Sequence, residues 1–138
     1  MELLFDRSVF GVTRKICVLI RIRLHVVELE GRLALEALLA EAAGVDTAKI
    51  PDALGSGYAG SNLLNVAFTR LIARDFEPGG YARQGLKDLD MVYELAKKTA
   101  TPTPMTDQAR ALYRLLIARG HGEGDAITLL KLYDEEPV

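Results

Sequence analysis

The segment 85–90 (GLKDLD) places Lys87 and Asp88 in the first turns of a predicted helix, just after the bend 78–80 (PGG). A lysine at this position can reach an anionic or carbonyl-bearing ligand, and the positive potential of a helix N-terminus favours the same ligand. The alternative is a surface lysine beside an aspartate that suits a helix start. From the residues alone, the surface interpretation is preferred.

Three side chains that can bind metal ions lie close together in the segment 120–125 (GHGEGD): His121, Glu123 and Asp125. Protein metal sites usually take their ligands from fixed elements with supporting contacts, and a glycine-rich loop provides neither. We therefore interpret the segment as a solvated loop whose last residue, Asp125, caps a short helix. No metal ion is expected.

The segment 55–60 (GSGYAG) has the glycine spacing of the dinucleotide-binding fingerprint. That fingerprint binds a pyrophosphate only where it follows a buried strand and opens a helix. The preceding residues 50–54 (IPDAL) are unsuited to a central strand, and no second strand with an acidic ribose ligand follows. The spacing therefore predicts a turn between two helices.

The single cysteine, Cys17, follows Arg14 and Lys15, whose charges can activate a thiolate. No histidine lies close to it in sequence, so a buried, inert thiol is the preferred interpretation. No acidic residue lies between Asp6 and Glu28. The basic residues of that stretch form either a phosphate-facing patch or, as we expect, a solvated face: Arg7, Arg14, Lys15, Arg21 and Arg23.

The elements that position these residues are predicted to be helical from residue 32 onward. Apolar residues recur there at three- and four-residue spacing between glycine and proline signals. The apolar stripes are Leu35, Leu38, Leu39 and Ala42; Leu64, Ala67, Phe68 and Leu71; Leu86, Leu89, Val92 and Leu95 or Ala96; Leu112, Leu115 and Leu116; and Ile127, Leu130 and Tyr133. Residues 46–54 predict a short or broken helix, because Pro51 lies too deep in it. Ser61, Thr103 and Asp125 are predicted N-caps.

The first thirty residues follow a different pattern. Residues 20–26 (IRIRLHV) alternate apolar and polar side chains, as a strand does, and His25 is expected at the surface. A helix through Ile16, Leu19, Arg23 and Val27 also fits, although it places an arginine in the apolar stripe. The pattern leaves strand and long helix open.

Length and composition limit the function classes. A chain of 138 residues, 49% hydrophobic and 26% charged, is typical of one globular domain, and its net charge of −2 argues against a nucleic-acid binder. The lone cysteine suits a reducing, cytoplasmic setting. No apolar run is long enough for a membrane span, and no signal peptide is recognised at the N-terminus.

Several segments, in order along the chain, resemble the helical C-terminal domain of the β-hydroxyacid dehydrogenases, a family that includes 3-hydroxyisobutyrate dehydrogenase and tartronate semialdehyde reductase. The similar segments are 37–46 (ALLAEAAGVD), 57–61 (GYAGS), 75–80 (DFEPGG), 86–89 (LKDL), 104–106 (PMT) and 122–125 (GEGD). The resemblance covers about residues 33 to 133.

The resemblance implies an all-α fold, a helical bundle like the C-terminal domain of 6-phosphogluconate dehydrogenase. That domain is expected over residues 33–138, after a divergent N-terminal segment, 1–32. In the family a Rossmann domain binds NAD or NADP, and the helical domain completes the substrate cleft and forms the subunit interface. By resemblance, Lys87 is the lysine that reaches the cofactor.

The family's helical domain opens with a catalytic lysine, which acts as general acid, followed at +3 by an asparagine that holds the substrate. The segment 11–17 (GVTRKIC) is similar to that opening, which makes Lys15 the candidate catalytic lysine. The sequence departs from the family at +3, where it has Val18. The spacing from Lys15 to Gly44 is also a few residues too long.

These implications suggest a separated or truncated module of an NAD(P)-dependent oxidoreductase for small 2- or 3-hydroxy or semialdehyde acids. Alone, it is expected to bind no dinucleotide tightly and to act only with a separate Rossmann-domain chain. The alternative is a non-enzymatic helical dimerisation module that retained the fold, which Val18 favours. A homodimer is expected, with neither nucleic acid nor membrane as partner.

Overall fold

The structure, a computed structural model, describes residues 29–134, and every regular element in this range is helical. Residues 29–42 form the first helix. The elements that follow are η1 (Thr47–Lys49), α2 (Ile50–Gly55), the π-helical stretch η2 (Leu64–Phe68), α3 (Thr69–Ile72), α4 (Ala82–Thr99), α5 (Pro104–Ala118), η3 (Ala126–Leu130) and α6 (Lys131–Asp134). The predicted all-α class is confirmed.

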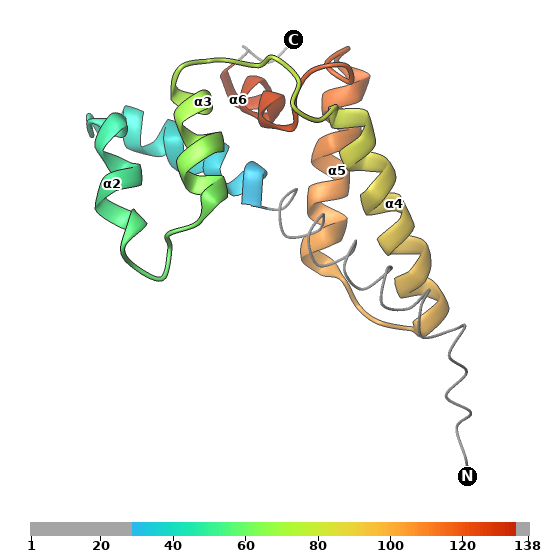
Figure 1. The fold of residues 1–138 in the computed structure, drawn as a ribbon. Coiled ribbons are helices and arrows are strands. Elements are labelled where there is room, and N and C mark those ends of the chain that lie inside the picture. Colours follow the sequence, from blue (N-terminus) through green and yellow to red (C-terminus); the bar gives the residue numbers. More distant parts are fainter. Residues whose placement is uncertain (1–28, 135–138) are drawn as a thin grey trace.

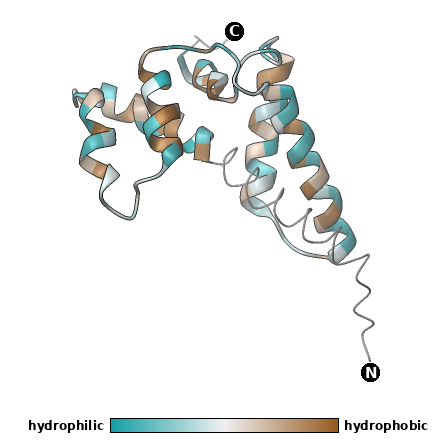
Figure 2. Cartoon of the chain, viewed as in Figure 1, coloured by the Kyte–Doolittle hydropathy of each residue, from teal (hydrophilic) through white to brown (hydrophobic). Residues whose placement is uncertain are grey.

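The helices form two groups (Figure 1). Helix 29–42, α2 and α3 make up the first group, and the antiparallel pair α4 and α5 makes up the second. The short helices η3 and α6 lie between them. Apolar and polar residues alternate along α4 and α5 in Figure 2, as amphipathic helices require.

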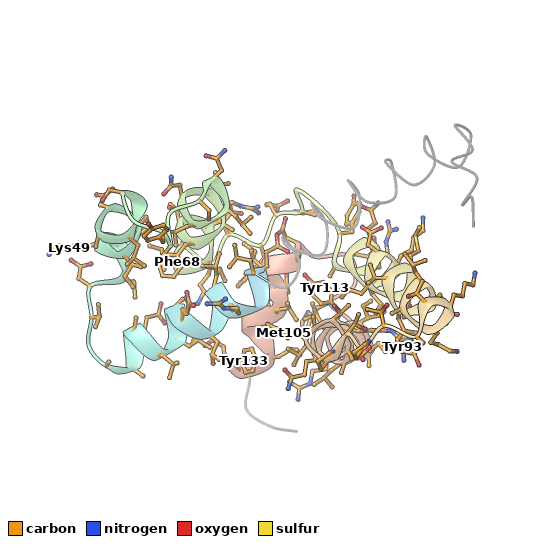
Figure 3. All side chains as sticks on the ribbon, turned by 90° about the horizontal axis from the view of Figure 1, so that it is seen from below. Lys49, Phe68, Tyr93, Met105, Tyr113 and Tyr133 are labelled. Carbon is orange, nitrogen blue, oxygen red and sulfur yellow. The ribbon has the colours of Figure 1, made fainter. Side chains whose placement is uncertain are left out.

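Each group has its own hydrophobic core, and η3 contributes to both. The first core contains Leu33, Ala34, Ala37, Leu64, Ala67, Phe68, Leu71, Ile127 and Leu130. The second contains Ala82, Leu89, Tyr113, Leu116, Ala126 and Leu129. Figure 3 shows Phe68 within the first group and Tyr113 on the side of α5 that faces it. The side chains of η3 therefore join the two groups.

The α4–α5 pair depends on a close approach at Gly85. A Cβ atom at this position would lie 2.8 Å from Cε1 of the buried Tyr113 ring, which is closer than real contacts allow. The glycine lets α4 pack directly against the tyrosine. Tyr113 was not among the predicted stripe residues.

Several local predictions are confirmed. The Leu64 N–H donates to Ser61 Oγ at 3.0 Å, and the Ile127 N–H donates to the Asp125 side chain, so both predicted caps form. Residues 46–54 hold a short 3-10 turn followed by α2, with Pro51 in its first turn, where a missing N–H costs little. Thr103 precedes α5 without a side-chain cap bond.

The predicted apolar stripe of helix 29–42 was wrong for Leu35, Leu39 and Ala42, which are exposed, whereas Leu38 packs against the first core as predicted. Leu35 and Leu39 are 46% and 61% exposed, whereas Leu33, Ala34 and Ala37 are buried. Both faces carry apolar residues at helical spacing, and the face with small alanines packs inward because it allows a closer approach. Leu115 and Tyr133, also predicted for stripes, are exposed.

The predictions for Lys15, Cys17, Val18, His25 and the basic stretch concern residues outside the described range. The choice between strand and long helix lies there too. Among residues 29–134, no helix is both long and apolar enough to cross a membrane.

Candidate functional site

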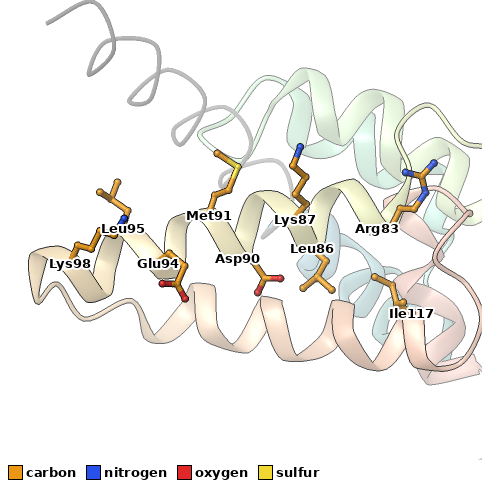
Figure 4. A pocket seen from close by; sticks show the side chains of 9 residues that line it. All are labelled: Arg83, Leu86, Lys87, Asp90, Met91, Glu94, Leu95, Lys98 and Ile117. Carbon is orange, nitrogen blue, oxygen red and sulfur yellow. The ribbon is translucent and has the colours of Figure 1, made fainter. Parts of the chain in front are cut away.

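Lys87 lies in the second turn of α4, on the outer surface of the α4–α5 pair. Its side chain points away from α5, on the same side as Met91, whereas Asp90 points toward α5 (Figure 4). Asp90 accepts hydrogen bonds from Arg110 and Arg114 of α5. No ion pair of Lys87 with another described residue is found. Within the described part of the chain, the Lys87 side chain is therefore exposed and has no ion-pair partner.

A groove with a volume of about 600 Å3 runs past Lys87 along α4. It is lined by Arg83, Leu86, Lys87, Asp90, Met91, Glu94, Leu95, Lys98 and Ile117 (Figure 4). Apolar side chains and the carboxylates of Asp90 and Glu94 lie along the middle, and basic residues lie at both ends. Such a groove suits a ligand or a domain with both apolar and anionic parts.

The N-terminus of α4 is not open to an anion, contrary to the ligand-binding interpretation of this segment. The Ala82 N–H donates to the Gly124 carbonyl at 2.8 Å, and the Arg83 N–H donates to the Gly122 carbonyl at 3.1 Å. An antiparallel bridge between Tyr81 and Asp125 continues the pairing. The first N–H groups of α4 thus donate to carbonyls of the 122–125 loop and cannot bind an anion. A ligand near Lys87 would therefore be bound by the lysine side chain and not by the helix N-terminus.

The 120–125 segment is a loop that ends in a cap, as predicted. Glu123 pairs with Arg83 at 2.7 Å, and Asp125 is buried at the start of η3. No cluster of three or more potential metal ligands is found among the described residues. The two carboxylates that the sequence grouped with His121 therefore serve different contacts.

The glycine-rich segment 55–60 is a turn between α2 and the following helix, which confirms the prediction. The Gly60 N–H donates to the Gly57 carbonyl at 3.0 Å, and the Gly57 N–H donates to the Leu54 carbonyl. A Cβ atom at Gly60 would lie 2.2 Å from the Gly55 carbonyl oxygen. The glycines here serve the close packing of the turn.

Asp125 is the centre of a polar cluster that sequence reasoning identified only as a cap. Its Oδ2 accepts from the Gly79 N–H at 2.7 Å, from the Gly80 N–H at 3.4 Å and from Arg70 at 3.3 Å. Arg70 also binds the Asp75 carboxylate. These bonds tie the 78–80 bend and α3 to the start of η3.

A second cavity, of about 400 Å3, lies between α3 and α4, and Glu30, Arg70, Gln84, Asp88 and Asp125 are among its lining residues. Glu30 is only 8% exposed, and its Oε2 accepts from the Tyr113 hydroxyl at 3.3 Å. Burial, followed by the Asp125 charge, raises the pKa of the Glu30 carboxyl to about 7, while Tyr113 and Arg70 oppose the shift.

The two halves of the Lys87–Asp88 pair therefore face different spaces, since Lys87 lines the outer groove and Asp88 the inner cavity. Neighbouring helix residues point about 100° apart, which explains the separation. Sequence reasoning missed Glu30, Arg70 and Tyr113. Only Gly85, a glycine inside a helix, signals the close contact with Tyr113.

A family model described as the NAD-binding region of NADP-dependent 3-hydroxyisobutyrate dehydrogenase matches residues 26–133. The chain belongs to this family. The resemblance to the β-hydroxyacid dehydrogenases that the sequence motifs suggested is thus confirmed.

Relatives in the 3-hydroxyisobutyrate dehydrogenase family agree with this assignment. The chain is 35% identical over 97 residues to the 2-hydroxy-3-oxopropionate reductase of Escherichia coli K12, a match that covers 70% of this chain and 33% of the reductase. It is 34% identical over 88 residues to a probable mitochondrial 3-hydroxyisobutyrate dehydrogenase-like protein of Arabidopsis thaliana. That match covers 64% of this chain and 26% of the Arabidopsis protein. The chain thus spans about a third or less of these relatives.

Solved structures of the family share the fold. The 3-hydroxyisobutyrate dehydrogenase of Salmonella typhimurium superposes with a TM-score of 0.77 at 22% identity, over 88% of this chain and 41% of that enzyme chain. The Mycobacterium tuberculosis 3-hydroxyisobutyrate dehydrogenase, solved with L-serine, gives a TM-score of 0.71 at 19% identity. The match covers 88% of this chain and 42% of that enzyme chain.

Proposed function

We propose that this chain provides the helical part of an NAD(P)-dependent oxidoreductase that acts on small 2- or 3-hydroxy or semialdehyde acids. The family match over residues 26–133 carries the proposal. The Escherichia coli relative is named as a reductase of 2-hydroxy-3-oxopropionate, and the Arabidopsis relative is named after 3-hydroxyisobutyrate. Both substrates belong to this chemical class.

The helical part acts together with a Rossmann domain that binds NAD or NADP, on a separate chain or elsewhere on the same polypeptide. Supporting this division, segment 55–60 of the described structure joins two helices and so lacks the strand that a dinucleotide-binding loop follows. The 138-residue chain alone is expected to bind a dinucleotide weakly and to turn over no substrate.

Within this proposal, Lys87 contacts the cofactor from the α4 groove. Its exposed side chain, its position beside apolar Leu86 and Met91, and the lack of an ion pair with any described residue support that role. A cofactor phosphate is the kind of group that a lysine ammonium binds as a point charge. Lys15 stays the candidate for the general acid on the strength of the motif alone.

Replacing Lys87 with alanine should raise the KM for NADPH about 10- to 100-fold when a family Rossmann domain is supplied to the chain. Losing one hydrogen bond between charged groups costs about 1.5–3 kcal/mol, and each 1.4 kcal/mol weakens binding about tenfold. Steady-state reduction of tartronate semialdehyde, followed at varied NADPH, measures it. The variant should unfold within about 0.5 kcal/mol of the parent, because the side chain is exposed.

Lys97→Ala is the matched control, since Lys97 is an exposed lysine of the same helix that does not line this groove. Its KM for NADPH should stay within about twofold of the parent value. An unchanged KM in Lys87→Ala would remove Lys87 from the cofactor site. Turnover by the 138-residue chain without any added domain would contradict the division of labour proposed above.

A second candidate function is that of a non-enzymatic helical dimerisation module. It is favoured by the outward face of helix 29–42, where Leu35 and Leu39 are exposed although both are large and apolar. Exposed apolar side chains that are contiguous often mark partner sites. The replacement of the family's asparagine by Val18 points the same way.

In either case the chain should form a homodimer through the region before Gly44. Multi-angle light scattering at micromolar concentration should give twice the 15.1 kDa monomer mass. Leu39→Glu should shift the species to the monomer, because it buries a charge in the apolar contact. Leu54→Glu, on exposed α2, should leave the dimer intact. A parent chain that runs as a monodisperse monomer would exclude self-association.

A further inference from the structure

Glu30 lies where the two helical groups meet. It belongs to helix 29–42, whose next turns supply Leu33, Ala34 and Ala37 to the first core, but its carboxylate contacts Tyr113 of the second core. A Cβ atom at the adjacent Gly31 would lie 3.7 Å from Leu129 of η3. The start of the helix is therefore packed against both η3 and α5.

The charged groups around Glu30 leave it without a cation of its own among the described residues. Arg70 of α3 donates to the carboxylates of Asp75 and Asp125 and to the carbonyls of Asp75 and Glu77. The Asp125 carboxylate accepts hydrogen bonds from Arg70 and from the Gly79 and Ile127 N–H groups. An ionised Glu30 would thus add a second buried negative charge beside Asp125.

The remaining neighbours do not compensate that charge. Tyr113 of α5 offers one hydrogen bond of 3.3 Å, which is long for a hydroxyl donor and therefore weak. From α4, Asp88 lines the same cavity and carries a further carboxylate, and Gln84 is neutral. A buried, poorly compensated carboxylate is strongly unfavourable.

The cavity beside Glu30 offers a way to relieve this cost. Its 400 Å3 is enough for several water molecules, and polar residues of α3 and α4 line it together with Ala67, Ala126 and Ile127 from the edges of the two cores. A small displacement of the first described turns of helix 29–42 would hydrate the carboxylate. The second core need not open.

We propose that Glu30 is a proton-operated latch: the protonated carboxyl holds the first described turn of helix 29–42 against α5 and η3, and the ionised carboxylate releases it. Release separates the two helical groups at the point where both line the inner cavity. This role of Glu30 is separate from the cofactor role proposed for Lys87, because Glu30 lines the inner cavity and Lys87 lines the outer groove.

The sign of the pH dependence follows from proton binding. The latched state binds a proton up to about pH 7, whereas a released, hydrated carboxyl has an ordinary glutamate pKa of 4.5. The latched state therefore holds more protons between these values, and release becomes easier as the pH rises through this window. Above about pH 7 both states are ionised, and the dependence ends.

Amide hydrogen exchange of the full chain, corrected for intrinsic rates, tests the latch. The opening constant for the amides of Ala34 and Ala37 should rise about 40-fold from pH 5 to pH 7, since the rise approaches tenfold per pH unit between the two pKa values and levels off near each of them. The amides of Leu89 and Leu116, in the second core, should not follow this profile. Glu30→Gln should abolish the rise, whereas Glu36→Gln, on the exposed side of the same helix, should keep it.

A flat profile in the parent, the same rise in Glu30→Gln, or an equal rise at Leu89 and Leu116 would overturn the proposal. Tyr113→Phe provides a second variant if Glu30→Gln does not fold. It removes the hydrogen bond that favours the ionised carboxylate, so the rise should extend to higher pH. A profile that ends at the same pH in this variant would also contradict the latch.

Discussion

Asp125→Ala should lower the free energy of unfolding by about 2–4 kcal/mol, because one buried carboxylate satisfies donors from three segments. The variant leaves the Gly79 and Ile127 N–H groups without acceptors and removes an ion pair from Arg70. Urea unfolding followed by circular dichroism measures the loss. About pH 5 is the appropriate condition, since Glu30 is then protonated and gains little when its charged neighbour is removed.

Asp125→Asn is the matched variant for this site. Its single carbonyl oxygen can still cap η3, so the Ile127 N–H keeps an acceptor, but the charge that pairs with Arg70 is lost. The expected loss is smaller, about 1 kcal/mol. Equal stability of Asp125→Ala and the parent would show that the cluster around Asp125 does not hold the 78–80 bend and η3 together.

Phe68→Ala should cost about 3–5 kcal/mol, the usual range for deleting a fully buried phenylalanine. Phe68 lies in the π-helical stretch η2, at the centre of the first core, with Leu64, Leu71 and Leu130 in the same cluster. Truncation leaves a cavity that these fixed neighbours cannot fill. The free energy of unfolding of a typical domain is only about 5–15 kcal/mol, so this loss would bring the first group of helices close to unfolding.

Val66→Ala in the same π-helical stretch is the control, because Val66 is 61% exposed. It should change the unfolding free energy by less than about 0.5 kcal/mol. Urea midpoints of the two variants, at equal slopes, give the comparison. A loss below about 1 kcal/mol in Phe68→Ala would mean that the first core tolerates or refills the cavity.

The local signals in the sequence predicted much of the fold. Ser61 and Asp125 form their caps because a cap depends on a side chain and an N–H two or three residues away. The stripe through Leu64, Phe68 and Leu71 was correct, since most of the large apolar residues of that helix share one face, although Val66 is exposed. These features are determined within a few residues of chain.

Contacts between distant segments could not be predicted in the same way. Glu30 and Tyr113 are separated by 83 residues, and nothing in either segment indicates the other. In helix 29–42, two apolar faces share the same spacing, and which one packs inward depends on the partner helices. The conclusion that Lys87 is exposed could be reached from its charge, but its separation from Asp88 into another cavity could not.

The position of η3 along the chain affects how the protein can fold during synthesis. Ile127 and Leu130 complete the first core, and Ala126 and Leu129 complete the second, although every other helix of both cores precedes them. A nascent chain that has reached only the end of α5 exposes the apolar residues of both unfinished cores to solvent or to chaperones. Neither group can therefore close on the ribosome until the segment 126–130 has left the exit tunnel.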